Sequence, residues 1–220
     1  MEDLQPLIDR ARRGDEAAFR EIFERHRDTV ARVVQRFLGP SADRDDVVQD
    51  VFVHVFRSIG SFRGEAKFST WLYRLTANVT KMHLRRAQSR PRIADAAIPE
   101  TVPEREPAES PEAILSRDRR VRALYRVLDR LSEKKRTALV LHDLEGLPAK
   151  EIAAIVGAPV LTVRTRLFYA RKELYAAIAT EPALRETMGR LLEDLPGRPD
   201  AGAPNPHPAA GSRPTKADRP

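Results

Sequence analysis

The stretch GLPAKEIAAIVGAPVLTVRTRLFYARKEL, at residues 146–174, is the most specific fold signal in the chain. Ala153 is a small residue on the buried face of a short helix, Gly157 stands four positions later, and Val163 resumes apolar spacing six positions after that. Alanine lets two helices approach closely, and glycine permits the left-handed turn that a sharp reversal requires. The spacing predicts a helix-turn-helix.

The second helix of this motif has side chains suited to reading duplex DNA. Its N-terminal residues would face base edges in the major groove. Arg164 can bind guanine through two hydrogen bonds, and Phe168 can contact a thymine methyl group. An ordinary helical hairpin also needs a small residue and a glycine, but the exposed basic residues of this helix favour DNA. These are Arg164, Arg166, Arg171 and Lys172.

A second pattern lies in FSTWLYRLTANVTKMHLRR, at residues 68–86, which holds the only tryptophan, Trp71. Residues three and four apart share a helix face, so Trp71 lies between an apolar stripe and a polar one. No acidic residue occurs between Glu65 and Asp95. A lone tryptophan is more often a half-buried aromatic at a domain edge, whereas an aromatic beside a cationic track suits a nucleic-acid strand. The polar stripe consists of Arg74, Asn78, Lys81 and Arg85.

Composition excludes several classes of protein. The 220 residues carry a formal net charge of +7, which favours an anionic partner, and include no cysteine, which excludes disulfides and thiolate chemistry. The histidines lack metal-ligand spacing and no glycine-rich phosphate loop occurs, so we expect no metal, no cofactor and no enzymatic activity. No apolar run approaches the ~20 residues that span a bilayer, and no signal-peptide core is present. We therefore expect a soluble cytoplasmic protein without stable membrane insertion.

Helical periodicity runs through nearly the whole chain and predicts an all-α fold of two helical domains joined by a flexible linker. The linker is a proline-rich stretch with few bulky apolar residues, and a Pro-, Ala- and Gly-rich tail is expected to be disordered. The expected boundaries are 1–86 for the first domain, 87–116 for the linker, 117–180 for the domain with the helix-turn-helix, and 181–220 for a short helix and the tail.

The first domain should contain four helices. We expect them over Leu4–Arg12, after an N-terminal cap at Asp15, from near Asp43, and after a cap at Ser69 or Thr70.

Both domains resemble parts of one family. GDEAAFREIFERH (14–26), DRDDVVQDVFVHVFRSIGSFRG (43–64) and residues 68–86 stand in the order and spacing of region 2 of bacterial sigma factors, and LDRLSEKKRTALVLHDLEGLPAKEIAAIVGAPVLTVRTRL (128–167) resembles region 4. The chain is thus similar to the extracytoplasmic-function (ECF) group of the sigma-70 family. The resemblance implies a promoter-specificity subunit that directs transcription initiation by bacterial RNA polymerase.

The resemblance also assigns roles to residues of the first domain. The positions that match the segment docking on the clamp helices of the polymerase's largest subunit are Asp45, Asp46, Val48, Gln49, Asp50 and Phe52. The positions that match the loop capturing a flipped base of the −10 element are Phe62, Arg63, Gly64, Glu65, Ala66, Lys67 and Phe68. The helix face beside the melted strand comprises Trp71, Arg74, Asn78, Lys81, Arg85 and Arg86.

The second domain is expected to read the −35 duplex and to contact the polymerase flap. The expected DNA-binding positions are Leu161, Thr162, Arg164, Thr165, Arg166, Phe168, Tyr169 and Arg171. Tyr169 stands where family members often carry a basic residue, and Leu161 where they often carry glycine. Both departures lie in the recognition helix, where they can change the −35 sequence preference.

In the resulting mechanism the linker of about 25 residues, extending ~80 Å at most, lets the two domains engage separated promoter elements. Two alternatives stay open: a helix-turn-helix regulator that acts on duplex DNA without polymerase core, and a helical adaptor that binds no DNA. A possible anti-sigma factor is a further expected partner, because such partners are common in this group.

Overall fold

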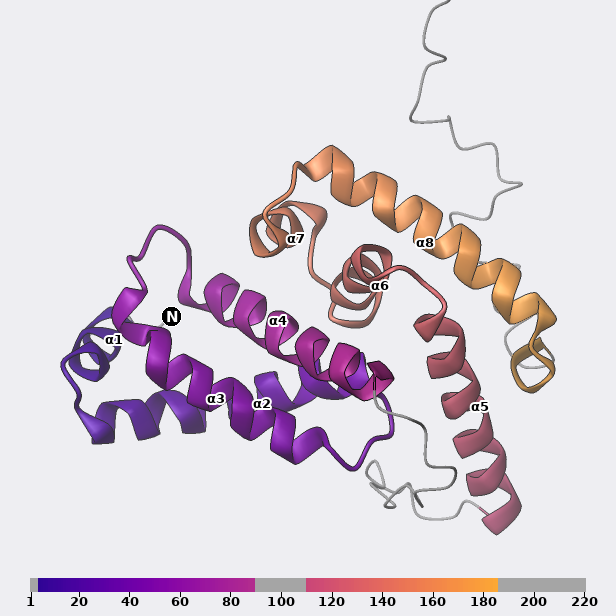
Figure 1. Ribbon diagram of the computed structural model, residues 1–220, viewed down its shortest axis with the longest axis horizontal. Helices are drawn as coiled ribbons and strands as arrows, with labels where there is room; N and C mark the ends of the chain where they lie inside the picture. The colour runs from indigo at the N-terminus through magenta and orange to yellow at the C-terminus, as the bar shows by residue number, and fades with distance from the viewer. Residues whose placement is uncertain (1–3, 90–109, 186–220) are drawn as a thin grey trace, which may run out of the picture.

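The computed structural model describes residues 4–89 and 110–185, and within these residues the secondary structure is helical without strands (Figure 1). The first body comprises α1 (Gln5–Arg12), α2 (Glu16–Leu38), α3 (Arg44–Ser58), the short 3-10 helix η1 (Ile59–Ser61) and α4 (Phe68–Ser89). The second body comprises α5 (Pro111–Asp129), α6 (Glu133–Leu139), the π-helical turn η2 (Val140–Leu144), α7 (Ala149–Val156) and α8 (Val160–Thr180). The predicted all-α fold is confirmed.

Local sequence signals start the helices of the first body. The Asp15 carboxylate accepts a 3.0 Å hydrogen bond from the amide three residues on and caps α2, as predicted. Helix α3 begins one residue after Asp43. Helix α4 begins at Phe68, so Ser69 and Thr70 lie inside its first turn and the prediction that either caps the helix is wrong. The buried Phe68 ring is anchored in the core, which draws this residue into the helix.

Helices α2, α3 and α4 pack around one apolar core, with α1 against α2 (Figure 1). The spacing of valine, isoleucine and phenylalanine along each helix gives it a continuous apolar stripe, and burying these stripes drives their association. The fully buried members of this core are Ala18, Ile22, Val30, Val34, Val47, Val51 and Val55.

The second body is built on α6 and α8, with α7 packed against α8 and η2. Gly157 ends α7 in the left-handed conformation, with φ 64° and ψ 43°, as the turn requires. Ile152, Ala153, Val163 and Leu167 are buried, so the two helices of the motif meet through the predicted apolar positions. Within the described residues no single helix is long and apolar enough to cross a membrane, and α7 with α8, which passes that test only as a pair, is bent by 104°.

The ends of the expected linker are helical, because α4 continues to Ser89 and α5 starts at Pro111. Residues 90–109 lie outside the described residues. The expected last helix is seen only as a turn at 182–185, and the rest of it and the tail also lie outside the described residues.

The two bodies are packed against each other. Val33 and Phe37 of α2 and Ala77 of α4 belong to the same buried cluster as Leu141, Ile152 and other apolar residues of the second body. Helix α4 contacts α7 directly and lies between the remaining helices of the first body and the second body (Figure 1). The strand-binding helix expected from the sequence is therefore also an interface helix.

Candidate nucleic-acid interface

Helix α8 buries one side and exposes the residues expected to read DNA. Val163, Leu167 and Ala170 face the core, which turns Arg164 outward. The outward residues at the start and middle of the helix include Leu161, which is 65% exposed, and Tyr169, which is 37% exposed. A helix presenting its N-terminal half in this way has the form needed to enter a major groove.

Arg171, also expected on the DNA-reading face, is held by the protein. Its Nε donates to Asp143 Oδ2 at 3.0 Å and its Nη2 donates to Asp143 Oδ1 at 2.5 Å. Burial favours a raised pKa for the Asp143 carboxyl, but the hydrogen bonds from Arg171 and His142 outweigh burial and lower that pKa. Arg171 therefore braces α8 against η2 in this conformation, and a DNA contact would require the pair to open.

The segment between η1 and α4 encloses a hollow of about 300 Å³. Arg63, Gly64, Glu65 and Ala66 form its rim, and Trp71 lies on its wall. Such a hollow is at the lower end of the range for small-ligand sites. The structure thus brings five of the seven residues expected to capture a flipped base, at positions 62–66, around one cavity, whereas Lys67 and Phe68 do not line it.

Three aromatic rings cluster beside this hollow. Phe62 and Phe68 are buried, with ring centroids 5.6 Å apart, and the half-buried Trp71 ring lies 5.5 Å from Phe62 and 5.4 Å from Phe68. Phe62 therefore lines the cavity although its side chain is largely buried, whereas Phe68 packs against Phe62 and Trp71 without lining the cavity. Trp71 has one side against the core and one toward the cavity, consistent with its border position in the sequence.

His26 of α2 packs under the aromatic group, and its role was not foreseen from the sequence. Its ring lies 5.3 Å from Phe68, and its buried Nε2 has no hydrogen-bond partner. Burial, followed by the nearby positive charge of Arg25, lowers the His26 pKa. The neutral imidazole is therefore the form that fits this site.

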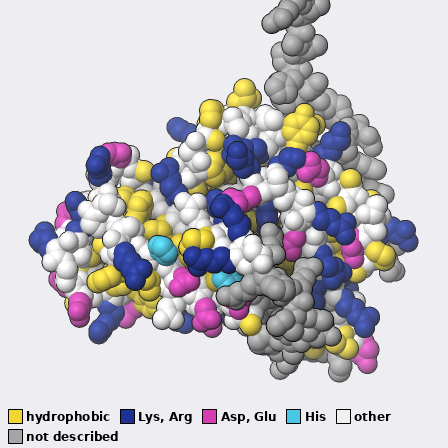
Figure 2. Space-filling model, in the orientation of Figure 1, with side chains coloured by type: hydrophobic (Ala, Val, Ile, Leu, Met, Phe, Trp, Pro, Cys, Tyr) yellow, Lys and Arg dark blue, Asp and Glu magenta, His cyan; other side chains and the backbone are white. Residues whose placement is uncertain are grey.

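The cationic face of α4, defined here as Arg74, Asn78, Lys81 and Arg85, points toward the second body. Arg85 forms two hydrogen bonds with the Glu133 carboxylate, at 2.7 and 2.9 Å, and Lys81 Nζ lies 3.5 Å from the same group. These hydrogen bonds and charges lower the Glu133 pKa and raise the Arg85 pKa. Figure 2 shows acidic side chains among the basic ones where the two bodies meet.

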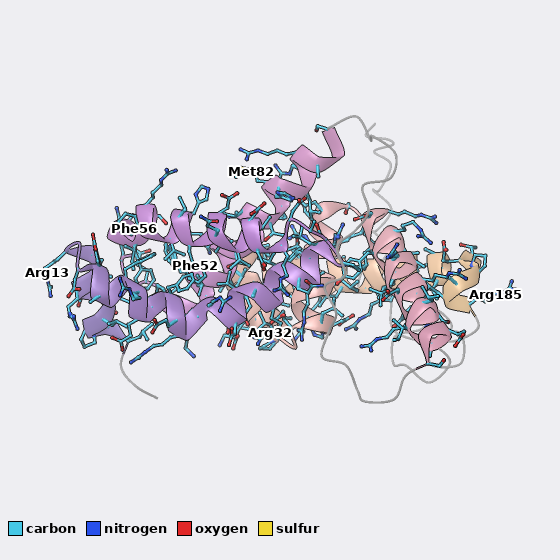
Figure 3. The ribbon with its side chains drawn as sticks, turned by 90° about the horizontal axis from the view of Figure 1, so that it is seen from below. Arg13, Arg32, Phe52, Phe56, Met82 and Arg185 are labelled. Carbon is cyan, nitrogen blue, oxygen red and sulfur yellow. The ribbon has the colours of Figure 1, made fainter. Side chains whose placement is uncertain are left out.

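Helix α3 carries the predicted polymerase-binding segment. Asp45, Asp46, Gln49 and Asp50 are exposed, as a docking surface requires, whereas Val48 and Phe52 are buried and shape this surface from below. The same outer face continues into Val53 and Phe56, which are 38% and 58% exposed (Figure 3). The sequence analysis assigned neither residue to the docking surface, although both lie at the helical spacing of its exposed positions.

Comparison with known proteins identifies both bodies. The family model for sigma-70 region 2 matches residues 22–90, and the model for sigma-70 region 4 matches residues 121–174. The RNA polymerase sigma-H factor of Pseudomonas aeruginosa is 35% identical over 190 residues, which cover 84% of this chain and 97% of that protein. The chain belongs to the sigma-70 family.

The ECF group is supported by a second relative of this sigma factor. The ECF RNA polymerase sigma-E factor of Escherichia coli is 37% identical over 175 residues, which cover 77% of this chain and 91% of that protein. A solved structure of CnrH in complex with the cytosolic domain of CnrY aligns with a TM-score of 0.58 and 27% identity, and covers 81% of this chain and 99% of CnrH. The resemblance seen in the sequence is confirmed.

In this sigma factor the predicted DNA-binding residues fall into two groups. The loop and Trp71 surround one open cavity, and Arg164 and the start of α8 face solvent. Arg74, Lys81, Arg85 and Arg171 instead have acidic or carbonyl partners within the protein. No set of three or more acidic or histidine side chains in the described ranges has the arrangement of a metal site.

Proposed function

We propose that this sigma factor, a promoter-specificity subunit of RNA polymerase, captures an unpaired base of the −10 element in the hollow beside Trp71 and reads the −35 duplex with α8. The observation that carries the proposal is the roughly 300 Å³ cavity, rimmed by the loop residues and walled by an aromatic ring next to a cationic helix. Extruding a base costs a few kcal/mol, and stacking on an aromatic ring recovers ~1–3 kcal/mol per base.

The sigma factor has a binding role in this proposal and no catalytic one. Polymerase core supplies the chemistry, receives α3 on the clamp helices of its largest subunit and α8's domain at its flap, and fixes the distance between the two DNA-binding bodies. An acidic α3 surface against a basic partner favours encounter and correct orientation. The site of action is the cytoplasm, where the polymerase works, and an anti-sigma factor is an additional partner.

The test is reconstitution with bacterial RNA polymerase core on promoter fragments, with transcription starts mapped and opening followed by 2-aminopurine fluorescence at −10. The wild-type chain should direct core-dependent starts, and Arg63→Ala should reduce opening at least tenfold. The matched control is Arg20→Ala, an exposed arginine of α2 away from the hollow. Tight duplex binding without core, or opening that survives changes in the loop, would contradict the proposal.

A further inference from the structure

The cationic face of α4 is occupied in this structure by acceptors from the second body. Besides the Glu133 carboxylate on Arg85 and Lys81, Arg74 donates to the carbonyl oxygens of Ala154 and Ile155, the latter at 2.9 Å. These carbonyls lie at the C-terminal end of α7, where the helix dipole adds negative potential. Every charged residue of the α4 face therefore meets a negative group of the other body.

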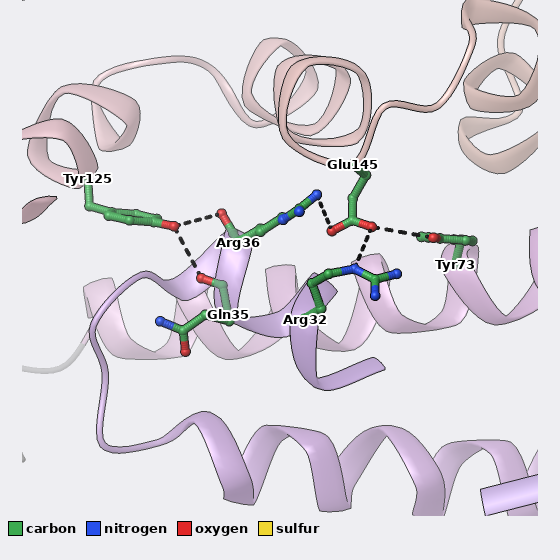
Figure 4. A network of polar contacts seen from close by, with 6 residues as sticks. All are labelled: Arg32, Gln35, Arg36, Tyr73, Tyr125 and Glu145. Carbon is green, nitrogen blue, oxygen red and sulfur yellow. Dashed lines mark hydrogen bonds and ion pairs between the residues drawn. The ribbon is translucent and has the colours of Figure 1, made fainter. Parts of the chain in front are cut away.

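A second polar cluster fixes the bodies in this arrangement. Glu145, whose side chain is 1% exposed, forms ion pairs with Arg36 at 2.8 Å and Arg32 at 3.4 Å, and it accepts a 3.4 Å hydrogen bond from the Tyr73 hydroxyl (Figure 4). Burial, together with the Glu145 charge, raises the Tyr73 pKa. A carboxylate this deeply buried is stable only while its cationic partners remain in place.

Further contacts extend the interface along α2. The Tyr125 hydroxyl of α5 donates to the carbonyl of Gln35 at 3.2 Å (Figure 4), and the buried Arg136 donates to the carbonyl of Phe37 at 2.6 Å. Phe37 also lies in the apolar cluster that both bodies share. The closed arrangement thus combines buried apolar area with paired charges rather than a single surface salt bridge.

The second body offers α4 the same chemistry as a nucleic-acid strand. A guanidinium binds a carboxylate and a phosphate in the same two-bond geometry. Glu133 meets Lys81 and Arg85, and the carbonyls at the end of α7 meet Arg74, so negative or partly negative groups contact the helix at several points along its length. Arg74 also lines the hollow beside Trp71, so the two surfaces meet at one residue.

We propose that the second body is an intramolecular competitor for the −10 strand, with Glu133 and the α7 carbonyls taking the place of phosphates and Glu145 holding the closed form. This inference rests on the proposed function, because it assigns the α4 face to a single strand. Only molecules in which the bodies have separated can bind the strand. The apparent strand affinity is therefore the intrinsic affinity multiplied by the fraction of open molecules.

The test uses the full chain with Glu133→Gln and Glu145→Gln, each nearly isosteric with the wild type. The absence of native cysteines allows fluorophores at Arg13→Cys and Ala179→Cys, exposed positions on the two bodies, to report their separation by energy transfer. Strand affinity is measured by anisotropy with a labelled single strand copied from the −10 segment of a promoter that the holoenzyme transcribes. Both substitutions should lower energy transfer and tighten strand binding roughly tenfold.

The matched control is Glu173→Gln, which removes the same charge and a 2.5 Å ion pair with Lys135 inside the second body. It should leave both signals unchanged, and circular dichroism verifies that all variants remain folded. Unchanged strand affinity in both interface variants, or equal tightening in the control, would overturn the inference. Tightening without a change in energy transfer would also overturn it, because the effect would then be local charge.

Core-dependent transcription by the wild type is measured in parallel. If the wild type initiates transcription while the interface variants match it in strand affinity and energy transfer, the inference fails and the proposed function stands. If the wild type directs no transcription with core, the proposed function fails, and energy transfer in the variants still reports whether Glu133 and Glu145 hold the two bodies together.

Discussion

At the scale of single residues, Arg74 connects the surfaces of the molecule. It lines the hollow beside Trp71, the cleft between the two bodies and the apolar groove between α3 and α4. Its position on a basic stripe was predicted from the sequence, but its two carbonyl acceptors lie about eighty positions away. Arg74 is therefore well placed to exchange its carbonyl acceptors in the closed form for strand phosphates in the open form.

Arg164 gives the first prediction at this scale. Arg164→Ala should weaken −35 selection by about 1–3 kcal/mol and relax the preference at one base pair, because a bidentate contact to guanine is lost. The measurement is holoenzyme binding to a set of −35 variants. Lys172 is an exposed charge two turns further along α8, and Lys172→Ala should weaken binding to all −35 sequences alike. If Arg164→Ala left the base preference unaltered, Arg164 would not be one of the residues that read the −35 sequence.

His26 gives a prediction about pH. Its pKa is lowered in the folded protein, so below about pH 6.5 the unfolded chain binds a proton that the folded site excludes. This contribution to stability is complete above pH 6.5 and is lost as pH falls toward the folded-state pKa. Between pH 7.5 and pH 5.5, the free energy of unfolding measured with urea should fall more for the wild type than for His26→Gln. Equal decreases in the two proteins would mean that the His26 ring is protonated as easily in the folded state as in the unfolded state.

At the scale of elements, the helix-turn-helix follows its sequence closely. Glycine at the turn, alanine at the close approach and aliphatic residues at the spacing of a helix face fix both helices locally, and Gly157 indeed adopts the left-handed conformation. The start of α4 was placed wrongly because Ser69 and Thr70 are good capping residues, and the burial of Phe68 outweighed that local preference. Tertiary context routinely overrides such local preferences.

The turn itself can be tested by Gly157→Ala. A β-carbon at this position would meet no neighbour within 4 Å, so the cost is backbone strain alone, about 1–2 kcal/mol, measured by urea unfolding. Gly60→Ala is the control, because Gly60 also has open space around it but no positive φ, and its effect should be within about 0.5 kcal/mol. Equal effects in the two variants would show that the left-handed conformation costs nothing here.

At the scale of the whole molecule, two helical bodies and a connecting segment could be predicted, but their packing could not. The interface uses Val33, Phe37 and Ala77, which already fit the apolar faces of their own helices and leave no separate signal. Its polar contacts join residues such as Arg32 and Glu145, 113 positions apart, and no local pattern reports such pairs. The sequence supplied the expected strand-binding residues as a list, whereas their contacts with the second body required the structure.

The competition between the second body and the promoter strand for the α4 face is tested most directly by tying the bodies together. Asn78 and Lys134 line the same cleft from opposite sides, so Asn78→Cys with Lys134→Cys can be joined by a cleavable bis-maleimide linker in this cysteine-free chain. With polymerase core and promoter DNA, the linked protein should direct little transcription. Cleavage of the linker should restore transcription to the level directed by protein that was modified at both cysteines but not linked. Equal transcription from linked and cleaved protein would contradict the account.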